Sequence, residues 1–142
     1  MPVMTAGTFS PGISTVSTFR VLVVEDDPIT REGLAVILGR EGFETITVAN
    51  GEQALTCLRS GPPPDLILLD MLMPVLDGWH FLDRLHAEAP KSPIPIILLT
   101  TLTILSLEWA QAHGCCGFIR KPVDPEEMLV EIRRCLPEGG TA

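Results

Sequence analysis

Five polar residues stand where short apolar runs end, and together they could carry out chemistry on a phosphate group. Asp26 and Asp27 follow the run RVLVVE, Asp70 follows LILL, Thr100 follows IILL, and Lys121 follows GFIR. If each run is a strand of one parallel sheet, the carboxyl ends of the strands meet at a single edge, which is where such folds bind ligands. The sequence therefore predicts one site assembled from residues that are far apart in the chain.

The chemistry of that site follows from three carboxylates beside an ammonium group and a hydroxyl group. Carboxylates a few ångströms apart repel each other by about 1 to 4 kcal/mol per pair, so a divalent cation is expected among them. Oxygen ligands without histidine favour Mg²⁺, whereas zinc would require His or Cys. With the phosphoryl charge neutralised by the metal and by Lys121, Asp70 could attack a phosphoryl group and form an aspartyl phosphate.

Strands and helices are expected to alternate along the chain, which would place these residues at one edge. Apolar runs short enough for strands are 20–25, 43–49, 62–70, 94–100 and 115–120, and segments with helical spacing are 26–42, 50–61, 78–90, 105–114 and 124–136. Continuously apolar strands are typical of a parallel sheet that right-handed crossovers cover on both faces. The pattern predicts a doubly wound α/β fold with five parallel strands and five helices.

Length and charge limit what else the chain can be. Its 142 residues, 46% of them hydrophobic, fit one domain with a substantial core. We expect a flexible leader at 1–19, the domain at 20–137 and a short tail at 138–142. The net charge of -8 and the lack of a basic run argue against direct binding of nucleic acid. No apolar stretch has the length to span a bilayer, so the sequence predicts a cytoplasmic protein.

The four cysteines, Cys57, Cys115, Cys116 and Cys135, show no pattern of metal binding or disulfide formation. They form neither a C-x-x-C pair nor a framework of the kind that small secreted proteins use. We therefore expect four small buried thiols in a reducing compartment.

Over about residues 20–136 the sequence resembles the receiver domain of two-component response regulators. The resemblance rests on the acidic pair Asp26-Asp27, the motif DMLMPVLDG that begins at Asp70, Thr100 after the fourth strand, and Lys121-Pro122 after the fifth. Each motif is short, but their order, their positions at strand ends and their spacings are together specific. The resemblance implies a flavodoxin-like fold with strand order 2-1-3-4-5.

The resemblance also implies a role for each residue at the predicted edge. Asp70 would be the phosphoryl acceptor, and Lys121 would bind a phosphoryl oxygen. Asp27 would bind Mg²⁺ directly, Asp26 would assist mostly through water, and the backbone carbonyl of Leu72 would be the remaining protein ligand. The peptide bond between Lys121 and the next proline would be cis, an isomer that only bonds preceding proline tolerate at low cost.

Phosphorylation would act on the rest of the domain through a two-state switch. In the family, the residue at the position of Thr100 moves toward the phosphoryl group, and the aromatic residue at the position of Phe118 turns inward to fill the space. The implied activity is regulatory rather than enzymatic. The domain would take a phosphoryl group from a sensor histidine kinase, a histidine phosphotransfer protein or a small donor, and would lose it slowly.

A second surface is predicted where the fourth helix begins. The segment LTILSLEW, residues 102–109, is more apolar than one buried helix face requires. We expect an interface over the fourth helix, the fifth strand and the fifth helix, with a homodimer as one form of it.

Two other functions stay open from the sequence alone. The chain could be a receiver-like interaction module that works without phosphorylation, although all five site residues are present. It could instead be a Mg²⁺-dependent phosphohydrolase of the haloacid dehalogenase type, but Leu72 stands where that class has a second aspartate.

Some of the single residues also have an alternative role. Asp26 or Asp27 could cap the helix that starts at Pro28, which does not exclude metal binding. Phe118 could be a core residue as well as part of a switch.

Overall fold

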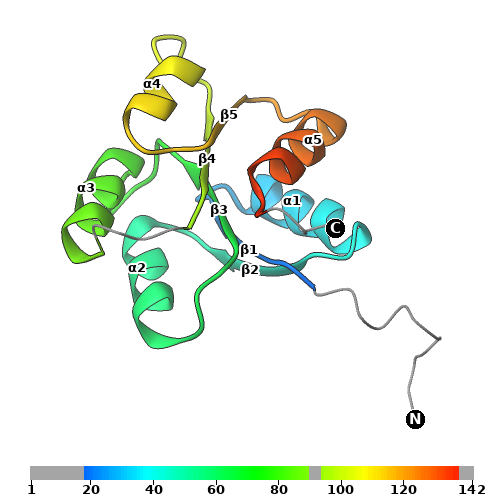
Figure 1. Cartoon of the computed structure of the whole chain (residues 1–142), viewed down its shortest axis with the longest axis horizontal. Coiled ribbons are helices and arrows are strands. Elements are labelled where there is room, and N and C mark those ends of the chain that lie inside the picture. Colours follow the sequence, from blue (N-terminus) through cyan, green and yellow to red (C-terminus); the bar gives the residue numbers. More distant parts are fainter. Residues whose placement is uncertain (1–17, 90–93, 138–142) are drawn as a thin grey trace.

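The computed structural model of the chain describes residues 18–89 and 94–137 (Figure 1). Within these residues five strands and five helices alternate, as the sequence predicted. In chain order they are β1 (Arg20–Val24), α1 (Pro28–Arg40), β2 (Glu44–Val48), α2 (Gly51–Ser60), β3 (Leu66–Asp70), α3 (Gly78–Glu88), β4 (Ile96–Thr100), α4 (Leu107–Ala112), β5 (Gly117–Arg120) and α5 (Pro125–Cys135).

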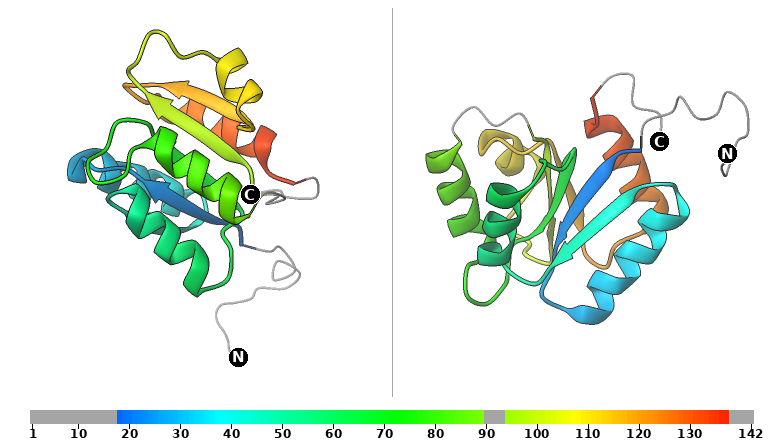
Figure 2. Two further views of the ribbon diagram at one scale, coloured as in Figure 1. Left: turned by 90° about the vertical axis from the view of Figure 1, so that its left-hand side faces the viewer. Right: turned by 90° about the horizontal axis from the view of Figure 1, so that it is seen from below.

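The strands form one parallel sheet in the order β2-β1-β3-β4-β5. Helices α1 and α5 cover one face, and α2, α3 and α4 cover the other, so the sheet is the middle of three layers (Figures 1 and 2). The predicted doubly wound, flavodoxin-like fold is confirmed. Because the winding direction reverses between β1 and β3, the carboxyl ends of these two strands flank the point where such folds bind ligands.

The central strands are buried on both faces, which explains why their sequences are continuously apolar. Successive side chains of a strand point to opposite faces. In β3, Ile67 and Leu69 belong to the core beneath α2 and α3, while Leu66 and Leu68 belong to the core beneath α1 and α5. A polar residue at the end of such a strand is therefore fixed in position by packing on both sides.

Each helix begins after the loop that follows the preceding strand, and each helix has a polar N-cap. The N-caps are Asp27, Asn50, Asp77, Ser106 and Asp124. Each cap side chain accepts a hydrogen bond from a backbone N–H group that has no partner within the helix. For α5, the Glu127 N–H donates to Asp124 Oδ2 at 3.1 Å.

Phe19, the last residue of the predicted leader, makes contacts with the folded domain. The Phe19 carbonyl accepts a hydrogen bond from the Glu44 N–H at 2.9 Å, and its side chain packs against the core on the α1 and α5 side. Apart from Thr18 and Phe19, the predicted leader lies outside the described residues, as does the predicted tail at 138–142. None of the helices in the described part of the chain is both long and apolar enough to cross a membrane.

Two of the four cysteines are joined by a disulfide, so the expectation of four free thiols is wrong. Cys116, directly before β5, is bonded to Cys135, the last residue of α5, and their Cα atoms lie 6.0 Å apart. Cys57 and Cys115 are free. The sequence separation of 19 residues fits no disulfide pattern, because the pairing arises only when the end of α5 packs beside the start of β5.

Candidate functional site

Three carboxylates gather at the carboxyl edge of the sheet, where β1 and β3 end. Glu25 and Asp26 follow β1 directly, and Asp70 is the last residue of β3. One carboxylate oxygen of each residue lies within 4.8 Å of the other two. Glu25 is fully buried, and Asp70 is 3% exposed. The structure thus brings Asp26 and Asp70 together and adds Glu25, which the sequence had not indicated as a site residue.

Lys121, which follows β5, supplies a positive charge to this cluster. Its Nζ lies 2.6 Å from Glu25 Oε1 and 3.4 Å from Asp70 Oδ1. Burial disfavours the charged ammonium group, but the hydrogen bond to Glu25 and the charge of Asp70 outweigh burial, so the pKa of Lys121 lies above its usual value. The lysine therefore stays protonated and links the ends of β1, β3 and β5. The peptide bond from Lys121 to Pro122 is cis, as the resemblance implied.

Asp70 lies in surroundings that disfavour its charge. Burial raises the pKa of its carboxyl group to about 7, the negative charge of Glu25 adds to this rise, and the charge of Lys121 opposes it. Asp70 Oδ1 also accepts a hydrogen bond from the Leu72 N–H at 3.3 Å. A cation beside Asp70 would favour the ionised carboxylate, which is the nucleophilic form.

Asp27, which the sequence pattern placed in the metal-binding pair, has another position. It is the N-cap of α1, and its Oδ2 accepts hydrogen bonds from the Thr30 hydroxyl at 2.6 Å and the Thr30 N–H at 2.9 Å. These hydrogen bonds lower the pKa of Asp27. The carboxylates that face Asp70 are one residue earlier in the chain. A signal for this lay in the sequence, since an aspartate directly before a proline at the first helical position is typical of an N-cap.

Thr100 ends β4 beside Asp70 in the sheet. The strands are paired so that Asp70 lies opposite Leu99, one residue before Thr100. Thr100 is 1% exposed, and its Oγ1 accepts a hydrogen bond from the Leu102 N–H at 2.9 Å. Its carbonyl accepts a hydrogen bond from the Lys121 N–H at 3.0 Å. Thr100 therefore connects the end of β5 to the loop that leads to α4.

Phe118 lies on β5 and is half-buried against the core on the α4 side. The guanidinium carbon of Arg120 is 4.9 Å from the centre of the Phe118 ring. Arg120 also donates hydrogen bonds to the carbonyls of Leu102 at 2.7 Å and Leu105 at 3.0 Å. Sequence inspection could not find this contact, because it depends on how the loop between β4 and α4 folds over β5. Arg120 thus connects the loop after Thr100 to the Phe118 side chain.

The loop between β3 and α3 forms another side of the site. Leu72, at the start of this loop, is 48% exposed. At its end the Gly78 N–H donates to the Met71 carbonyl at 3.0 Å, and a Cβ atom on Gly78 would lie 2.8 Å from Met71 Cα. Only glycine allows two backbone segments to approach so closely. The Asp-Gly turn therefore lets α3 begin directly against the end of β3, beside Asp70.

The composition of the cluster fits a hard divalent cation. Three carboxylates and one ammonium group leave an excess of negative charge within a few ångströms. The grouped side chains offer only oxygen donors and include no His or Cys, a set that suits Mg²⁺ rather than zinc. Mg²⁺ usually keeps several waters and binds substrate phosphate as well, so one or two of these carboxylates are enough to hold it.

Comparison with known proteins identifies the family. A family model described as the response regulator receiver domain matches residues 21–133. The chain belongs to the response regulator receiver domain family. An acidic pocket such as that of Glu25, Asp26 and Asp70 is typical of the phosphoacceptor site of a receiver domain. Receiver domains are generally regulatory phosphoacceptors rather than enzymes, and their partners are histidine kinases.

Two curated proteins are similar to this receiver domain in sequence, one over about half of its length and one over nearly its whole length. The DNA-binding response regulator MtrA of Mycolicibacterium smegmatis is 38% identical over 119 residues, which cover 80% of this chain and 49% of MtrA. The chain thus spans about half the length of that relative. Protein PilH of Pseudomonas aeruginosa is 31% identical over 118 residues, which cover 82% of this chain and 97% of PilH.

Solved structures support the same assignment for the receiver domain. Chemotaxis response regulator CheY4 of Vibrio cholerae matches with a TM-score of 0.75 and 32% identity, over 84% of this chain and 100% of CheY4. Response regulator TrrA of Thermotoga maritima, solved in complex with Mg²⁺ and BeF, matches with a TM-score of 0.73 and 30% identity. That match covers 84% of this chain and 100% of TrrA.

Proposed function

We propose that this receiver domain accepts a phosphoryl group on Asp70 from a sensor histidine kinase or a histidine phosphotransfer protein in the cytoplasm. The observation that carries the proposal is the position of Asp70 at the carboxyl edge of the sheet. There its carboxylate lies 3.4 Å from the ammonium group of Lys121 and within 4.8 Å of the carboxylates of Glu25 and Asp26. This arrangement suits a nucleophile that must approach a charged phosphoryl group.

Mg²⁺ is the proposed cofactor of this reaction. In our assignment Asp26 and Asp70 bind it through their carboxylates and Leu72 through its backbone carbonyl. The acidic pair is thus shifted by one residue: Asp26 takes the direct role that the sequence had suggested for Asp27, and Glu25 takes the assisting role suggested for Asp26. Support comes from the oxygen donors of the cluster and from TrrA, a structurally similar protein that was crystallised with Mg²⁺ and BeF.

In the proposed transfer, a carboxylate oxygen of Asp70 forms a bond to phosphorus. The bond from phosphorus to the donor's leaving atom breaks, and its electron pair stays with the donor. Mg²⁺, when bound, neutralises charge on the phosphoryl oxygens. Lys121, 3.4 Å from Asp70 Oδ1, provides positive charge from the side of β5. Because Leu72 and Leu102 beside the site have no group to guide water, we expect slow hydrolysis of the product.

We further propose that Thr100 and Phe118 transmit phosphorylation to the surface of α4, β5 and α5. If the Thr100 hydroxyl turns toward a phosphoryl oxygen, it gives up the hydrogen bond that it accepts from the Leu102 N–H in this structure. The Leu102 carbonyl is held by Arg120, whose guanidinium group lies over the Phe118 ring. A rearrangement at Thr100 can therefore reach Phe118 through this one loop.

Incubation of the chain with acetyl phosphate and Mg²⁺ tests the proposed function. We expect the intact mass to increase by one phosphoryl group, peptide mapping to locate it at Asp70, and EDTA to prevent the increase. If the mass does not change, the chain is better described as an interaction module that works without phosphorylation. If it instead hydrolyses a phosphate ester continuously, the phosphohydrolase is the better description.

The α4-β5-α5 surface is also proposed to form an interface, with a homodimer as the form to test. Ile104, in the loop before α4, is 80% exposed, and Leu107 on α4 and Val130 on α5 are exposed as well. Light scattering at high protein concentration is expected to detect dimers that Ile104→Asn weakens. Ile29→Asn is the matched control, because Ile29 is 81% exposed but lies on α1. A wild-type chain that stays monomeric at high concentration would contradict the homodimer.

A further inference from the structure

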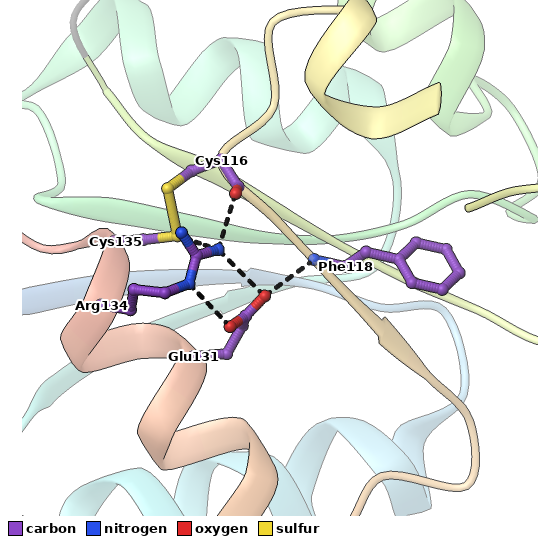
Figure 3. The surroundings of a disulfide bond; sticks show 5 residues. All are labelled: Cys116, Phe118, Glu131, Arg134 and Cys135. Atoms are coloured by element: carbon purple, nitrogen blue, oxygen red, sulfur yellow. Dashed lines mark hydrogen bonds and ion pairs between the residues drawn. A yellow bond between two sulfur atoms is a disulfide. The ribbon is translucent and has the colours of Figure 1, made fainter. Parts of the chain in front are cut away.

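A disulfide and a charged cluster join the last turn of α5 to the start of β5 (Figure 3). Cys135 ends α5 and is bonded to Cys116, directly before β5. One guanidinium nitrogen of Arg134, Nη2, donates to the Cys116 carbonyl at 2.8 Å and lies 3.5 Å from Cys135 Sγ. The bond and the cluster therefore act on the same contact between helix and strand.

The same arginine extends the cluster toward β5. Arg134 forms an ion pair with Glu131 at 3.0 Å, and Glu131 Oε2 accepts a hydrogen bond from the Phe118 N–H at 3.4 Å. Figure 3 shows these side chains in a row between the disulfide and the strand. The ion pair would remain if the disulfide were opened, so the helix would stay near the strand but without a covalent link.

The bonded cysteines differ from their neighbour in the features that govern thiol exchange. Cys116 is only partly buried, Cys135 is 8% exposed, and Cys135 has a positive charge beside its sulfur. A cation near sulfur stabilises the thiolate that exchange requires. Cys115, by contrast, is buried, and burial raises the pKa of its thiol to about 12. Cys115 therefore stays protonated and cannot compete for the disulfide.

We propose that Cys116 and Cys135 form a reversible redox couple, whose oxidised state fixes the last turn of α5 to β5 and whose reduced state releases it. In the reducing direction, a thiolate of a small dithiol attacks the sulfur of Cys116, the less buried of the two cysteines. The sulfur–sulfur bond breaks, and its electron pair goes to Cys135 Sγ beside Arg134. The second thiol of the dithiol then attacks the mixed disulfide, which leaves two thiols on the protein and a disulfide in the reagent.

This couple lies away from the phosphoryl chemistry. Cys116 stands at the amino end of β5, whereas Lys121 and Asp70 stand at the carboxyl edge of the sheet. Its direct effect falls on α5 and β5, two of the three elements of the surface described above. Oxidation and phosphorylation would thus act on one surface from opposite ends of the sheet, and the redox couple can be tested without phosphorylating the chain.

Equilibration of the full chain in buffers of reduced and oxidised dithiothreitol tests the proposal. After alkylation of the free thiols, peptide mapping is expected to show Cys116 and Cys135 becoming labelled together as the buffer becomes more reducing. Hydrogen exchange at residues 131–136 is expected to be roughly tenfold faster in the reduced form, because the cross-link no longer limits local opening. Exchange in α1 is expected to stay the same in both forms.

Two variants test whether the redox response belongs to Cys116 and Cys135. Cys57→Ser removes a free thiol and is expected to leave the dependence on buffer composition unchanged. Arg134→Gln removes the charge beside Cys135 and is expected to slow reduction by dithiothreitol, while the disulfide still forms. Full alkylation of Cys116 and Cys135 in the most oxidising buffer would overturn the proposal. Equal hydrogen exchange of the α5 terminus in the oxidised and reduced chains would overturn it as well.

Discussion

Asp70→Asn is expected to abolish phosphoryl uptake while the fold stays intact. The amide has nearly the shape of the carboxylate, so the end of β3 keeps its packing, but the amide provides no carboxylate oxygen to attack phosphorus. Acetyl phosphate and Mg²⁺ should then leave the intact mass of the variant unchanged under conditions that label the wild-type chain. Far-ultraviolet circular dichroism checks that the variant is folded.

The same substitution is expected to stabilise the protein in the absence of metal. Burial, followed by the charge of Glu25, raises the pKa of Asp70 from 3.8 to about 7. The folded state therefore binds this proton more tightly than the unfolded state, and the stability gained from it is lost as the pH rises from about 4 through about 7. Asparagine carries no charge at any of these pH values. Above about pH 7 the free energy of unfolding of the Asp70→Asn variant should therefore exceed that of the wild-type protein by on the order of 2 kcal/mol.

Urea unfolding in EDTA, followed by tryptophan fluorescence, measures this difference. The excess stability of Asp70→Asn should be clear at about pH 8 and smaller at about pH 5, where more of the wild-type Asp70 is protonated in the folded state.

In the acetyl phosphate experiment, labelling of the variant to the same extent as the wild type would show that another residue is the acceptor. In urea unfolding, a variant that is less stable than the wild type at about pH 8 would show that the charge of Asp70 does not destabilise the folded state.

The fold class and the position of Asp70 could be predicted because both depend on local sequence, whereas the strand order came from the resemblance to receiver domains. β3 is buried on both faces, so its residues form a continuous apolar run, and a charged residue directly after the run marks the carboxyl edge. The turn at Asp77-Gly78 and the cap at Asp124 follow from short-range backbone hydrogen bonding. Such signals need no knowledge of residues that are distant in the chain.

Features that depend on packing between distant elements could not be predicted. The disulfide needs the last turn of α5 to lie beside the start of β5, and the contacts of Arg120 need the loop before α4 to fold over that strand. The acidic residues after β1 are an intermediate case. Three consecutive acids are chemically alike, and only the position of Pro28 indicates that Asp27 belongs to the helix and Glu25 to the cluster.

Substitutions at these three acids test that assignment directly. Glu25→Gln and Asp26→Asn each remove one charge from the cluster and are expected to weaken Mg²⁺ binding and slow phosphorylation by roughly 10- to 100-fold. Asp27→Asn is expected to leave both close to the wild-type values, because asparagine caps helices about as well as aspartate does. Titration calorimetry with Mg²⁺ measures the affinity, and the rate of mass increase with acetyl phosphate measures phosphorylation.

The comparison is informative because all three substitutions remove the same charge from adjacent residues. A general electrostatic effect would weaken Mg²⁺ binding similarly in all three variants. If only the carboxylates of the cluster take part in the site, Glu25→Gln and Asp26→Asn weaken Mg²⁺ binding and Asp27→Asn does not. Glu25 forms the ion pair with Lys121, so thermal unfolding of Glu25→Gln distinguishes a loss of stability from a loss of metal binding. If Asp27→Asn loses Mg²⁺ binding while Glu25→Gln keeps it, the carboxylate that caps α1 is the metal ligand and our assignment of the acidic pair is wrong.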